Sequence, residues 1–478
     1  MIRRTKIVAT VGPACEDQKG LEALLVAGVD VFRLNFSHGE QEQKRVWIKT
    51  IRELSRKYER AVSILGDLQG PKIRTGLMRD GEQILKVGQK VIITTDQREG
   101  ADGIIPTSYK NLPQDVVVGN QILLDDGQLE LEVLGTDGNE VQCLVRVGGL
   151  LKDRKGINLP GVKVSAPAMT EKDRQDLQFC IEQSIDWVAL SFVRAADEVQ
   201  KLKEILSRAG SELKVIAKIE KPEAVDNFAA ILDSSDGIMV ARGDLGVEIL
   251  SERVPLIQKN IIRQCNLAGK PVITATQMLE SMIQNPRPTR AETSDVANAI
   301  LDGTDAVMLS GETASGSYPI EAVKVMDRVA RDVETDSRLH KRIHALMPDS
   351  DGSSPLTEAI GQAACQVAEN VGATAILAFT QTGSTAALVA KYRPNMPVLA
   401  VTPSQKVRRR LALYSGIRSL RVDIEGSTEA QIVSVADAVL ASGLLKDGEV
   451  VVLTMGSPMS APGTTNLLKV HRLQSSDS

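Results

Sequence analysis

The stretch Lys214–Glu248, KVIAKIEKPEAVDNFAAILDSSDGIMVARGDLGVEI, decides the fold of this chain. It holds two apolar, β-branched runs, Val215–Ile216 and Ile238–Val240, and charged residues follow each run closely. Continuous apolar runs of this kind predict parallel strands buried on both faces, and charges at their carboxyl ends are poor core material. Because α/β barrels carry their active sites at the carboxyl ends of the strands, we expect a barrel with its chemistry at these two ends.

The charged residues at the two strand ends predict a metal site. Alternation along a strand places Lys218 and Glu220 on one side of the first strand, and Arg242 and Asp244 on one side of the second. Two carboxylates from neighbouring strand ends provide the oxygen ligands that Mg²⁺ prefers, and a nearby lysine can stabilise developing negative charge. The simpler alternative is two surface salt bridges at strand ends.

Apolar runs alternate with amphipathic helical stretches along much of the chain, which is typical of parallel βα units. Eight such runs are predicted to be strands, the number that closes a (β/α)₈ TIM barrel. They are Lys6–Val11, Val31–Asn35, Ser63–Asp67, Trp187–Phe192, Val215–Ile219, Gly237–Ala241, Pro271–Ala275 and Ala306–Leu309. Polar residues gather after the carboxyl ends of six of them, so we expect one functional rim.

The spacing breaks between the third and fourth strands. Gly70–Ala168 is far longer than a connecting helix requires, and its β-type runs are separated by turns such as Asp126-Gly127. We predict an inserted small β-barrel domain over residues 71–167 that acts as a lid over the barrel mouth and excludes water on closure. The alternative is an insertion that lies far from the site.

A second α/β pattern begins after the polar segment Met347–Ser354. Its predicted strands, Ala375–Phe379, Val398–Val401 and Glu449–Thr454, alternate with helical stretches, which favours a separately folding, doubly wound α/β domain. The predicted domains are therefore a catalytic barrel over residues 1–70 and 168–345, the lid over 71–167, and a C-terminal domain over 355–478.

Composition argues against several classes of function. The net charge of −4 and the 3% of aromatic residues give no basic surface or stacking platform for nucleic acid or anionic membranes. The five cysteines show no CxxC pair, as expected of reduced core thiols in the cytoplasm. A strand pattern begins almost at the N-terminus, which leaves no room for a signal peptide, and no apolar run reaches membrane-spanning length.

Six motifs together make the chain closely resemble the pyruvate kinases, from Arg4 to about Asn466, without extra N- or C-terminal domains. The motifs are Leu34–Gly39 (LNFSHG), Ser63–Gly76 (SILGDLQGPKIRTG), Ala217–Pro222 (AKIEKP), Met239–Gly246 (MVARGDLG), Thr274–Met282 (TATQMLESM) and Met308–Thr313 (MLSGET). The resemblance implies a cytoplasmic, homotetrameric glycolytic phosphotransferase. Its implied reaction moves the phosphoryl group of phosphoenolpyruvate to ADP, giving ATP and pyruvate, and this chemistry requires positioning and charge neutralisation.

The resemblance also implies roles for individual residues. Glu220 and Asp244 would hold Mg²⁺, with Mn²⁺ as an alternative ion. The residues implied to be catalytic are Lys218, Arg33, Thr276 and Ser310, with Glu312 nearby. Those implied to bind substrate are Arg33, Lys218, Gly243, Asp244 and Thr276, and those implied to meet the phosphates of the nucleotide are Asn35, His38, Arg74 and Lys155. The chain has no Walker A or GxGxxG motif, so these residues do not form a P-loop or Rossmann site.

One motif departs from the pattern of many pyruvate kinases, which bind K⁺. Asn35, Ser37 and Asp67 match three of the implied K⁺ ligands, but Leu68 replaces a threonine and Lys72 replaces a glutamate. A fixed ammonium at Lys72 could supply the charge of the missing ion. We therefore expect a K⁺-independent enzyme with a vestigial K⁺ site; the alternative is a Lys72 that points to solvent at the lid hinge.

The C-terminal domain is implied to bind an effector. The residues Thr380, Thr382, Gly383, Ser384 and Thr385 join a predicted strand to a helix, where hydroxyls and a glycine can form a phosphate cradle. With the loop Gly456–Asn466 they would bind a sugar phosphate or AMP that regulates the enzyme allosterically. Neither segment carries an arginine or lysine, so helix capping is the alternative.

Two other functions fit parts of the sequence. A carbon–carbon lyase of the Mg²⁺-enolate type shares acidic metal ligands at barrel strand ends but lacks the lid and the setting of Lys218. A catalytically silent metabolite sensor would keep the fold while being free to lose the reactive residues, and the presence of Lys218, Glu220 and Asp244 weighs against it.

Overall fold

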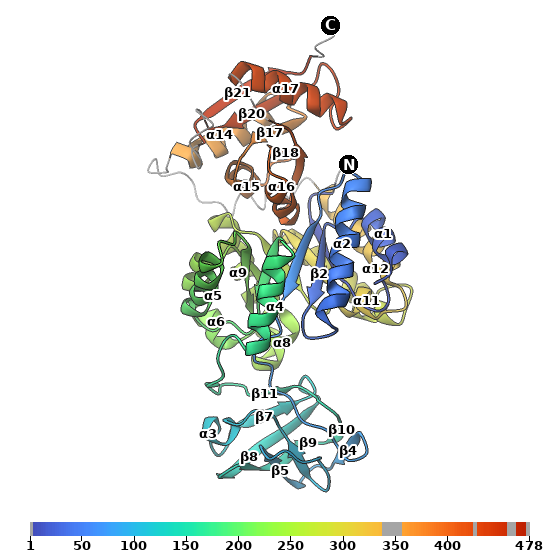
Figure 1. Ribbon diagram of the computed structural model, residues 1–478, viewed down its shortest axis with the longest axis vertical. Helices are drawn as coiled ribbons and strands as arrows, with labels where there is room; N and C mark the ends of the chain where they lie inside the picture. Colours follow the sequence, from blue (N-terminus) through green and yellow to red (C-terminus); the bar gives the residue numbers. More distant parts are fainter. Residues whose placement is uncertain (1–2, 337–355, 424–427, 457–464, 475–478) are drawn as a thin grey trace.

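Three parts follow one another along the long axis of the molecule (Figure 1): a C-terminal α/β domain, a central barrel and a β domain at the opposite end. This computed structural model describes residues 3–336, 356–423, 428–456 and 465–474. The predicted linker Met347–Ser354 lies outside the described residues. No helix within these ranges is long and apolar enough to cross a membrane. All five cysteines are buried and reduced.

The central part is a closed, eight-stranded parallel barrel with the order β1-β16-β15-β14-β13-β12-β3-β2, which confirms the predicted TIM barrel. Its strands are β1 (Lys6–Thr10), β2 (Val31–Asn35), β3 (Ser63–Asp67), β12 (Trp187–Leu190), β13 (Lys214–Ile219), β14 (Gly237–Ala241), β15 (Val272–Ala275) and β16 (Ala306–Leu309). Most of these residues are buried, because helices cover the outside of the barrel and side chains fill its interior.

Amphipathic helices surround the barrel. They are α1 (Gln18–Ala27), α2 (Gln41–Lys57), α4 (Glu171–Glu182), α5 (Ala196–Arg208), α6 (Pro222–Asp226), α7 (Phe228–Ser234), α9 (Val254–Ala268), α10 (Arg290–Leu301), α11 (Gly311–Ala314) and α12 (Pro319–Glu334). Helices α4 and α10 each begin with a capping box, formed by Thr170 with Asp173 and by Thr289 with Glu292. Such boxes satisfy backbone N–H groups at the first turn and so define where the helix begins.

One local prediction was wrong. Arg242 and Asp244 do not continue the β14 strand, because the chain turns after Ala241 into the short helix α8 (Arg242–Glu248). Their positions therefore follow helical rather than alternating geometry. The prediction failed because the glycines at 243 and 246 weaken helix propensity, while the helix gains from tertiary packing: Leu245 is fully buried.

The inserted domain is entirely of short strands apart from one helical turn, α3 (Leu112–Asp115). A six-stranded sheet has the order β11-β7-β8-β9-β5-β6, and a two-stranded sheet pairs β10 with β4. Their bounds are β4 (Glu82–Leu85), β5 (Lys90–Thr94), β6 (Ile104–Pro106), β7 (Gln121–Leu124), β8 (Leu129–Asp137), β9 (Glu140–Val147), β10 (Gly149–Lys152) and β11 (Ile157–Asn158). Both sheets contribute to one hydrophobic core, which includes Leu85 and Leu151.

The C-terminal domain has a five-stranded sheet with the order β19-β18-β17-β20-β21. Separate hydrophobic clusters lie on its two faces, as predicted for a doubly wound domain. Its elements are α14 (Leu356–Asn370), β17 (Ala375–Phe379), α15 (Ser384–Lys391), β18 (Val398–Thr402), α16 (Gln405–Arg410), β19 (Ile417–Arg421), α17 (Thr428–Ala441), β20 (Val450–Met455) and β21 (Leu467–Arg472). Only β21 runs antiparallel to its neighbour.

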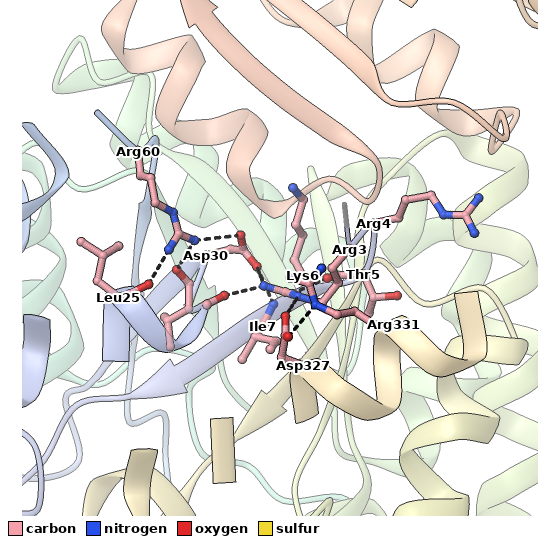
Figure 2. A network of polar contacts seen from close by, with 12 residues as sticks. Arg3, Arg4, Thr5, Lys6, Ile7, Leu25, Asp30, Arg60, Asp327 and Arg331 are labelled. Atoms are coloured by element: carbon pink, nitrogen blue, oxygen red, sulfur yellow. Dashed lines mark hydrogen bonds and ion pairs between the residues drawn. The ribbon is translucent and has the colours of Figure 1, made fainter. Parts of the chain in front are cut away.

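The C-terminal domain sits on the amino-terminal ends of the barrel strands, away from the predicted functional rim. Nε of Arg409 in α16 lies 2.8 Å from Asp186, just before β12, and Nζ of Lys6 in β1 donates a hydrogen bond of 2.7 Å to the carbonyl of Ile417 in β19. Figure 2 shows the polar network beside Lys6, in which Arg3 and Arg60 converge on the carboxylate of Asp30. This charged contact leaves the opposite rim facing the lid.

Candidate active site

Lys218, in strand β13, lies in a buried cluster of polar side chains at the lid-facing rim. Its Nζ is 2.8 Å from Oε1 of Glu220 and 3.3 Å from Oδ1 of Asp67, and it donates a 2.9 Å hydrogen bond to Oγ of Ser191. Burial alone would lower the pKa of Lys218, but the two carboxylates outweigh this effect and raise it above its ordinary value. The ammonium is therefore kept charged and held in place.

Glu220 follows β13, and its carboxylate is buried. Oε2 accepts a hydrogen bond of 2.7 Å from the backbone N–H of Phe192, whereas Oε1 meets Lys218 in an ion pair and accepts no hydrogen bond with good geometry. Burial raises the pKa of Glu220; Lys218 opposes this effect and Asp244 adds to it, with a raised pKa as the net result. A buried carboxylate with a second carboxylate, Asp244, nearby is suited to bind a cation.

Glu220 and Asp244 lie close enough to interact electrostatically, and their carboxylate oxygens could serve as ligands of a divalent ion. No cluster of three or more His, Cys, Asp or Glu side chains suited to a metal occurs in the described ranges. Mg²⁺ is commonly bound through one or two carboxylates, with water and substrate phosphates completing its octahedral shell. A donor set of two carboxylates, Glu220 and Asp244, therefore fits Mg²⁺ whose remaining ligands come from water and phosphate oxygens.

Arg33, in β2, is oriented by two neighbours. Its Nε donates a hydrogen bond of 2.6 Å to Oδ2 of Asp67, and Nη1 donates one of 2.9 Å to Oγ1 of Thr10. Burial would raise the pKa of Asp67, but the positive charges of Lys218 and Arg33 outweigh this effect. The pKa of Asp67 is therefore below its ordinary value, which favours the ionised carboxylate. Asp67 thus joins the two cations of the rim, Arg33 and Lys218, across strands β2, β3 and β13.

Thr276 follows β15 in a strained backbone conformation. Its φ of +68° is unusual for a β-branched residue, and the next residue, Gln277, also has a positive φ of +54°. Nη2 of Arg242 donates a hydrogen bond of 2.7 Å to the carbonyl of Thr276, while Nη1 pairs with Asp295 at 2.7 Å. The backbone N–H of Gly243 donates to Oγ1 of Thr276 at 2.7 Å. These contacts connect Thr276 to the helix that carries Asp244.

Ser310 lies at the end of β16, where α11 begins. Its Oγ is buried and has no hydrogen-bond partner, and its backbone N–H donates to Oε2 of Glu312 at 2.7 Å. Oε1 of the fully buried Glu312 accepts a hydrogen bond of 3.1 Å from the N–H of Leu279. Glu312 therefore ties the loop after β15 to the loop after β16.

Two family models match the chain. The model described as "Pyruvate kinase, barrel domain" matches residues 2–323, and the model described as "Pyruvate kinase, alpha/beta domain" matches residues 358–471. The chain belongs to the pyruvate kinase family. This result bears out the family that the six sequence motifs indicated.

Individual pyruvate kinases are similar over almost the whole chain. The pyruvate kinase of Geobacillus stearothermophilus is 49% identical over 474 residues, which is 98% of this chain and 80% of that protein. The pyruvate kinase of Staphylococcus aureus strain USA300 is 46% identical over the same shares of each chain. The crystal structure of a pyruvate kinase from Cryptosporidium parvum aligns with a TM-score of 0.91 at 41% identity, over 98% of this chain and 96% of that one. This similarity supports pyruvate kinase activity.

The residues that pyruvate kinase resemblance assigned to the nucleotide lie around the junction of barrel and lid. Nη1 of Arg74 donates to the carbonyl of Arg154 at 3.2 Å, and Lys155 pairs with Asp125 at 2.9 Å. The side chain of Asn35 accepts a hydrogen bond of 3.0 Å from the N–H of Ser37. Partial burial lowers the pKa of His38, and the positive charges around it, with Arg74 the strongest, lower it further. The surroundings of His38 are therefore positively charged, through Arg74, Lys44, Arg33 and Lys72.

The residues of the predicted vestigial K⁺ site all contact other groups of the protein. Asp67 is occupied by Arg33 and Lys218, and Asn35 by the backbone of Ser37. Lys72, at the lid hinge, lies 3.7 Å from Asp244, with its side chain 26% exposed. The alternative in which Lys72 points only to solvent is therefore wrong, since its ammonium reaches the acidic residue on α8.

The predicted effector cradle precedes helix α15. Oγ1 of Thr380 accepts a hydrogen bond of 2.8 Å from the N–H of Gly383, which has a φ of +98°. The hydroxyls of Thr382 and Ser384 are 3.0 Å apart, and Thr385 contacts Thr465 at 3.0 Å. The second predicted loop, Gly456–Asn466, lies largely outside the described residues.

Sequence reasoning missed the contacts by which three residues shape the rim, and it missed one of these residues, Thr10, altogether. Ser191 accepts from Lys218, Thr10 orients Arg33, and Arg242 holds the backbone of Thr276. The sequence indicated Ser191 and Arg242 as polar residues at strand ends, but not their contacts, which cross between strands. Thr10 ends β1 after three apolar residues, Ile7–Ala9, and nothing in its local sequence pointed to this role.

Proposed function

We propose that the chain transfers the phosphoryl group of phosphoenolpyruvate to ADP, forming ATP and pyruvate, at the rim around Lys218. The observation that carries this proposal is the buried cluster in which Lys218 meets Glu220 and Asp67, with Arg33 on the other side of Asp67. It concentrates two fixed cations beside the carboxylates suited to Mg²⁺. Phosphoryl transfer depends on such positioning and charge neutralisation.

Lys218 and Arg33 supply the positive charge for the reaction. Lys218 is kept protonated by Asp67 and Glu220, so it can stabilise the transferring phosphoryl group and the enolate oxygen that forms as the bond to phosphorus breaks. Arg33 is fixed at Nε and Nη1, which directs its guanidinium to bind the phosphate. Backbone N–H groups near Gly243, at the start of α8, would bind the substrate carboxylate.

Glu220 and Asp244 would hold Mg²⁺, or Mn²⁺ in its place. When bound, the ion supplies charge neutralisation between the substrate and the two phosphates of the nucleotide. Cations around His38, among them Arg74 and Lys72, would attract the nucleotide phosphates, with Asn35 and Lys155 as further contacts.

Conversion of the enolate to pyruvate requires a proton at carbon. Thr276 would lie beside that carbon and belong to the path that delivers the proton. It would not be the acid itself, because a hydroxyl needs a relay to supply a proton. The buried Oγ of Ser310, which lacks a partner, would take part in this path.

Lys72 would replace K⁺ in this enzyme. Its ammonium lies 3.7 Å from Asp244, so positive charge is present beside the site without a dissociable monovalent ion. The test is the initial rate of pyruvate formation from phosphoenolpyruvate, ADP and Mg²⁺ in potassium-free buffer, and again after KCl is added. Full activity before addition supports both assignments. Activity only after addition overturns the role of Lys72, and inactivity of the folded protein in both buffers favours the sensor alternative.

Two further properties depend on family resemblance. A sugar phosphate or AMP would bind at Thr380, Thr382, Gly383, Ser384 and Thr385 and act as an allosteric effector; the left-handed turn at Gly383 before α15 supports this site. Isothermal titration with ribose 5-phosphate, glucose 6-phosphate and AMP tests it, and absence of both heat and kinetic effect overturns it. The enzyme would be a homotetramer, which light scattering after gel filtration can test.

A further inference from the structure

Glu248, the last residue of α8, connects three separate elements. Its side chain is only 2% exposed. Its Oε1 lies 2.5 Å from Nζ of Lys221, which follows β13, and accepts a hydrogen bond of 2.9 Å from Nδ2 of Asn158, in strand β11 of the lid. In Figure 1, α8 is the helix of the barrel that faces β11. We call Glu248, Lys221 and Asn158 the hinge joint.

The hinge joint is buried as well as charged. Asn158 is 7% exposed, and the side chain of Lys221 is 15% exposed. A buried carboxylate is tolerated only when its partners remain in place, because removing one leaves a charge without solvation. The contacts of Glu248 therefore favour one relative placement of lid, α8 and the loop after β13.

The barrel side of the joint is adjacent to both proposed metal ligands. Lys221 directly follows Glu220 in the sequence, and Glu248 lies four residues after Asp244, on the same face of α8. The ion pair between Lys221 and Glu248 thus joins the backbones that carry Glu220 and Asp244.

The lid side of the joint is adjacent to the lid hinge. The N–H of Ile157, next to Asn158, donates a hydrogen bond of 2.9 Å to the carbonyl of Ile73, next to Lys72. A small cleft of about 40 Å³ at this junction is lined by residues of both parts, including Lys72, Asn158, Phe192 and Lys221. The hydrogen bond of Asn158 is therefore one of several direct polar contacts between lid and barrel, beside the pair of Lys72 with Asp244 and the hydrogen bonds of Arg194 to the carbonyls of the lid's last residues.

We propose that Glu248 is a positioning residue that couples the position of the lid to the spacing of the two carboxylates that bind the divalent ion. This inference rests on the proposed function, since it takes Glu220 and Asp244 as the metal ligands. Glu248 itself touches neither substrate nor ion. Closure of the lid would reach the metal site through Asn158 and Glu248, and ion binding would reach the lid by the same route, as linkage requires.

The test uses the full chain and the variants Glu248→Gln, Asn158→Ala and Glu248→Gln/Asn158→Ala. Titration of Mn²⁺ onto the protein without substrate, followed by electron paramagnetic resonance, reports ion affinity. Hydrogen exchange over residues 71–167 reports lid motion. We expect Glu248→Gln to weaken Mn²⁺ binding about tenfold and to speed exchange at β11, whereas Asn158→Ala speeds exchange and weakens Mn²⁺ binding about threefold.

The matched control is Asp302→Asn. Asp302 is also a buried carboxylate paired with a lysine, Lys259, but it lies at the end of α10 and touches neither lid nor α8. It should lower thermal stability while leaving Mn²⁺ affinity and lid exchange unchanged. Should Glu248→Gln fail to fold, Asn158→Ala still decides the matter, because it leaves the pair of Lys221 and Glu248 intact.

Non-additivity provides the third criterion. If Asn158 acts through Glu248, the double variant should weaken Mn²⁺ binding no more than Glu248→Gln alone. Wild-type affinity for Mn²⁺ in both single variants overturns the inference, as does full additivity. A wild-type protein that binds Mn²⁺ but forms no pyruvate would instead overturn the proposed function, while the coupling between lid and ion would still be measured.

Discussion

Nζ of Lys72, at the base of the lid, lies 3.7 Å from Oδ1 of Asp244 on helix α8 of the barrel. Both side chains are 26% exposed, so solvent screens the pair and its contribution to stability is small. Its importance is positional, because it brings a permanent positive charge to one of the two carboxylates proposed to bind Mg²⁺.

Replacement of the Lys72 ammonium by a carboxylate should make the enzyme require K⁺. We expect Lys72→Glu to lower the rate of pyruvate formation in potassium-free buffer by at least tenfold, since a third carboxylate then repels the substrate phosphates, and we expect added K⁺ to restore much of the loss. Initial rates over a KCl titration measure this. The exposed Lys152→Glu, elsewhere in the lid, should remain insensitive to K⁺. Equal loss with and without K⁺ would contradict the assignment.

Removal of the ammonium from the rim should stop the chemical step. Lys218→Met is expected to lower kcat by about 10³, the range found when a single group that stabilises transition-state charge is lost. Binding of phosphoenolpyruvate should weaken much less. Stopped-flow rates and equilibrium binding separate the two effects. Lys214→Met, at the other end of the same strand, should keep wild-type kcat; a kcat within tenfold of wild type in Lys218→Met would show that the ammonium is not part of the reaction.

The hydroxyl of Thr276 should matter more for turnover than for affinity. Thr276→Ala removes the acceptor of the Gly243 N–H and is expected to lower kcat about 10²-fold with little change in KM. Thr276→Ser keeps the hydroxyl and should stay within a few-fold of wild type. Steady-state kinetics of the two variants provide the comparison. Similar losses in both would point to the backbone turn at φ +68° rather than to the hydroxyl.

Lys6 should make stability depend on pH. Burial lowers the pKa of Lys6 to about 8, while Asp30 opposes this effect and Arg3, Arg418 and Arg60 add to it. Because this pKa lies below the unfolded value of 10.5, the cost of burying the ammonium is fully present below pH 8 and is lost as pH rises to 10.5. The wild type should therefore gain up to about 3 kcal/mol relative to Lys6→Met over this window.

Thermal midpoints of the wild type and of Lys6→Met between pH 7 and 10.5 measure the difference. The exposed Lys110→Met serves as the control, and its midpoint should follow that of the wild type throughout. A constant difference between Lys6→Met and the wild type would mean that Lys6 titrates normally in spite of the network shown in Figure 2.

Much of the fold could be predicted because barrel strands are buried on both faces. Strands such as β14, GIMVA, appear as continuous apolar runs, and the structure has them within a residue or two of the predicted bounds. Strands β19 and β21 were missed since they lie at the two edges of the C-terminal sheet and carry charged, partly exposed residues, as in IRSLR and LLKVHR. Such edge strands lack the continuous apolar run by which a buried strand is recognised in the sequence.

The sequence by itself determined which residues stand at strand ends. Lys218, Glu220 and Thr276 stand at the carboxyl ends of apolar runs. These ends form one rim, because the parallel strands of a barrel all end on the same side. Short motifs, whose residues are close along the chain, also indicated the family.

Only the tertiary structure decided how these residues meet. Asp67 lies between Arg33 and Lys218, and Glu248 receives Lys221 and the lid residue Asn158, from segments up to 151 residues apart in the chain. The physical reason is that ion pairs form between groups that are close in space, and not only between groups that are close in sequence. Which buried charges meet depends on which elements pack together, and the periodicity of the sequence does not determine that packing.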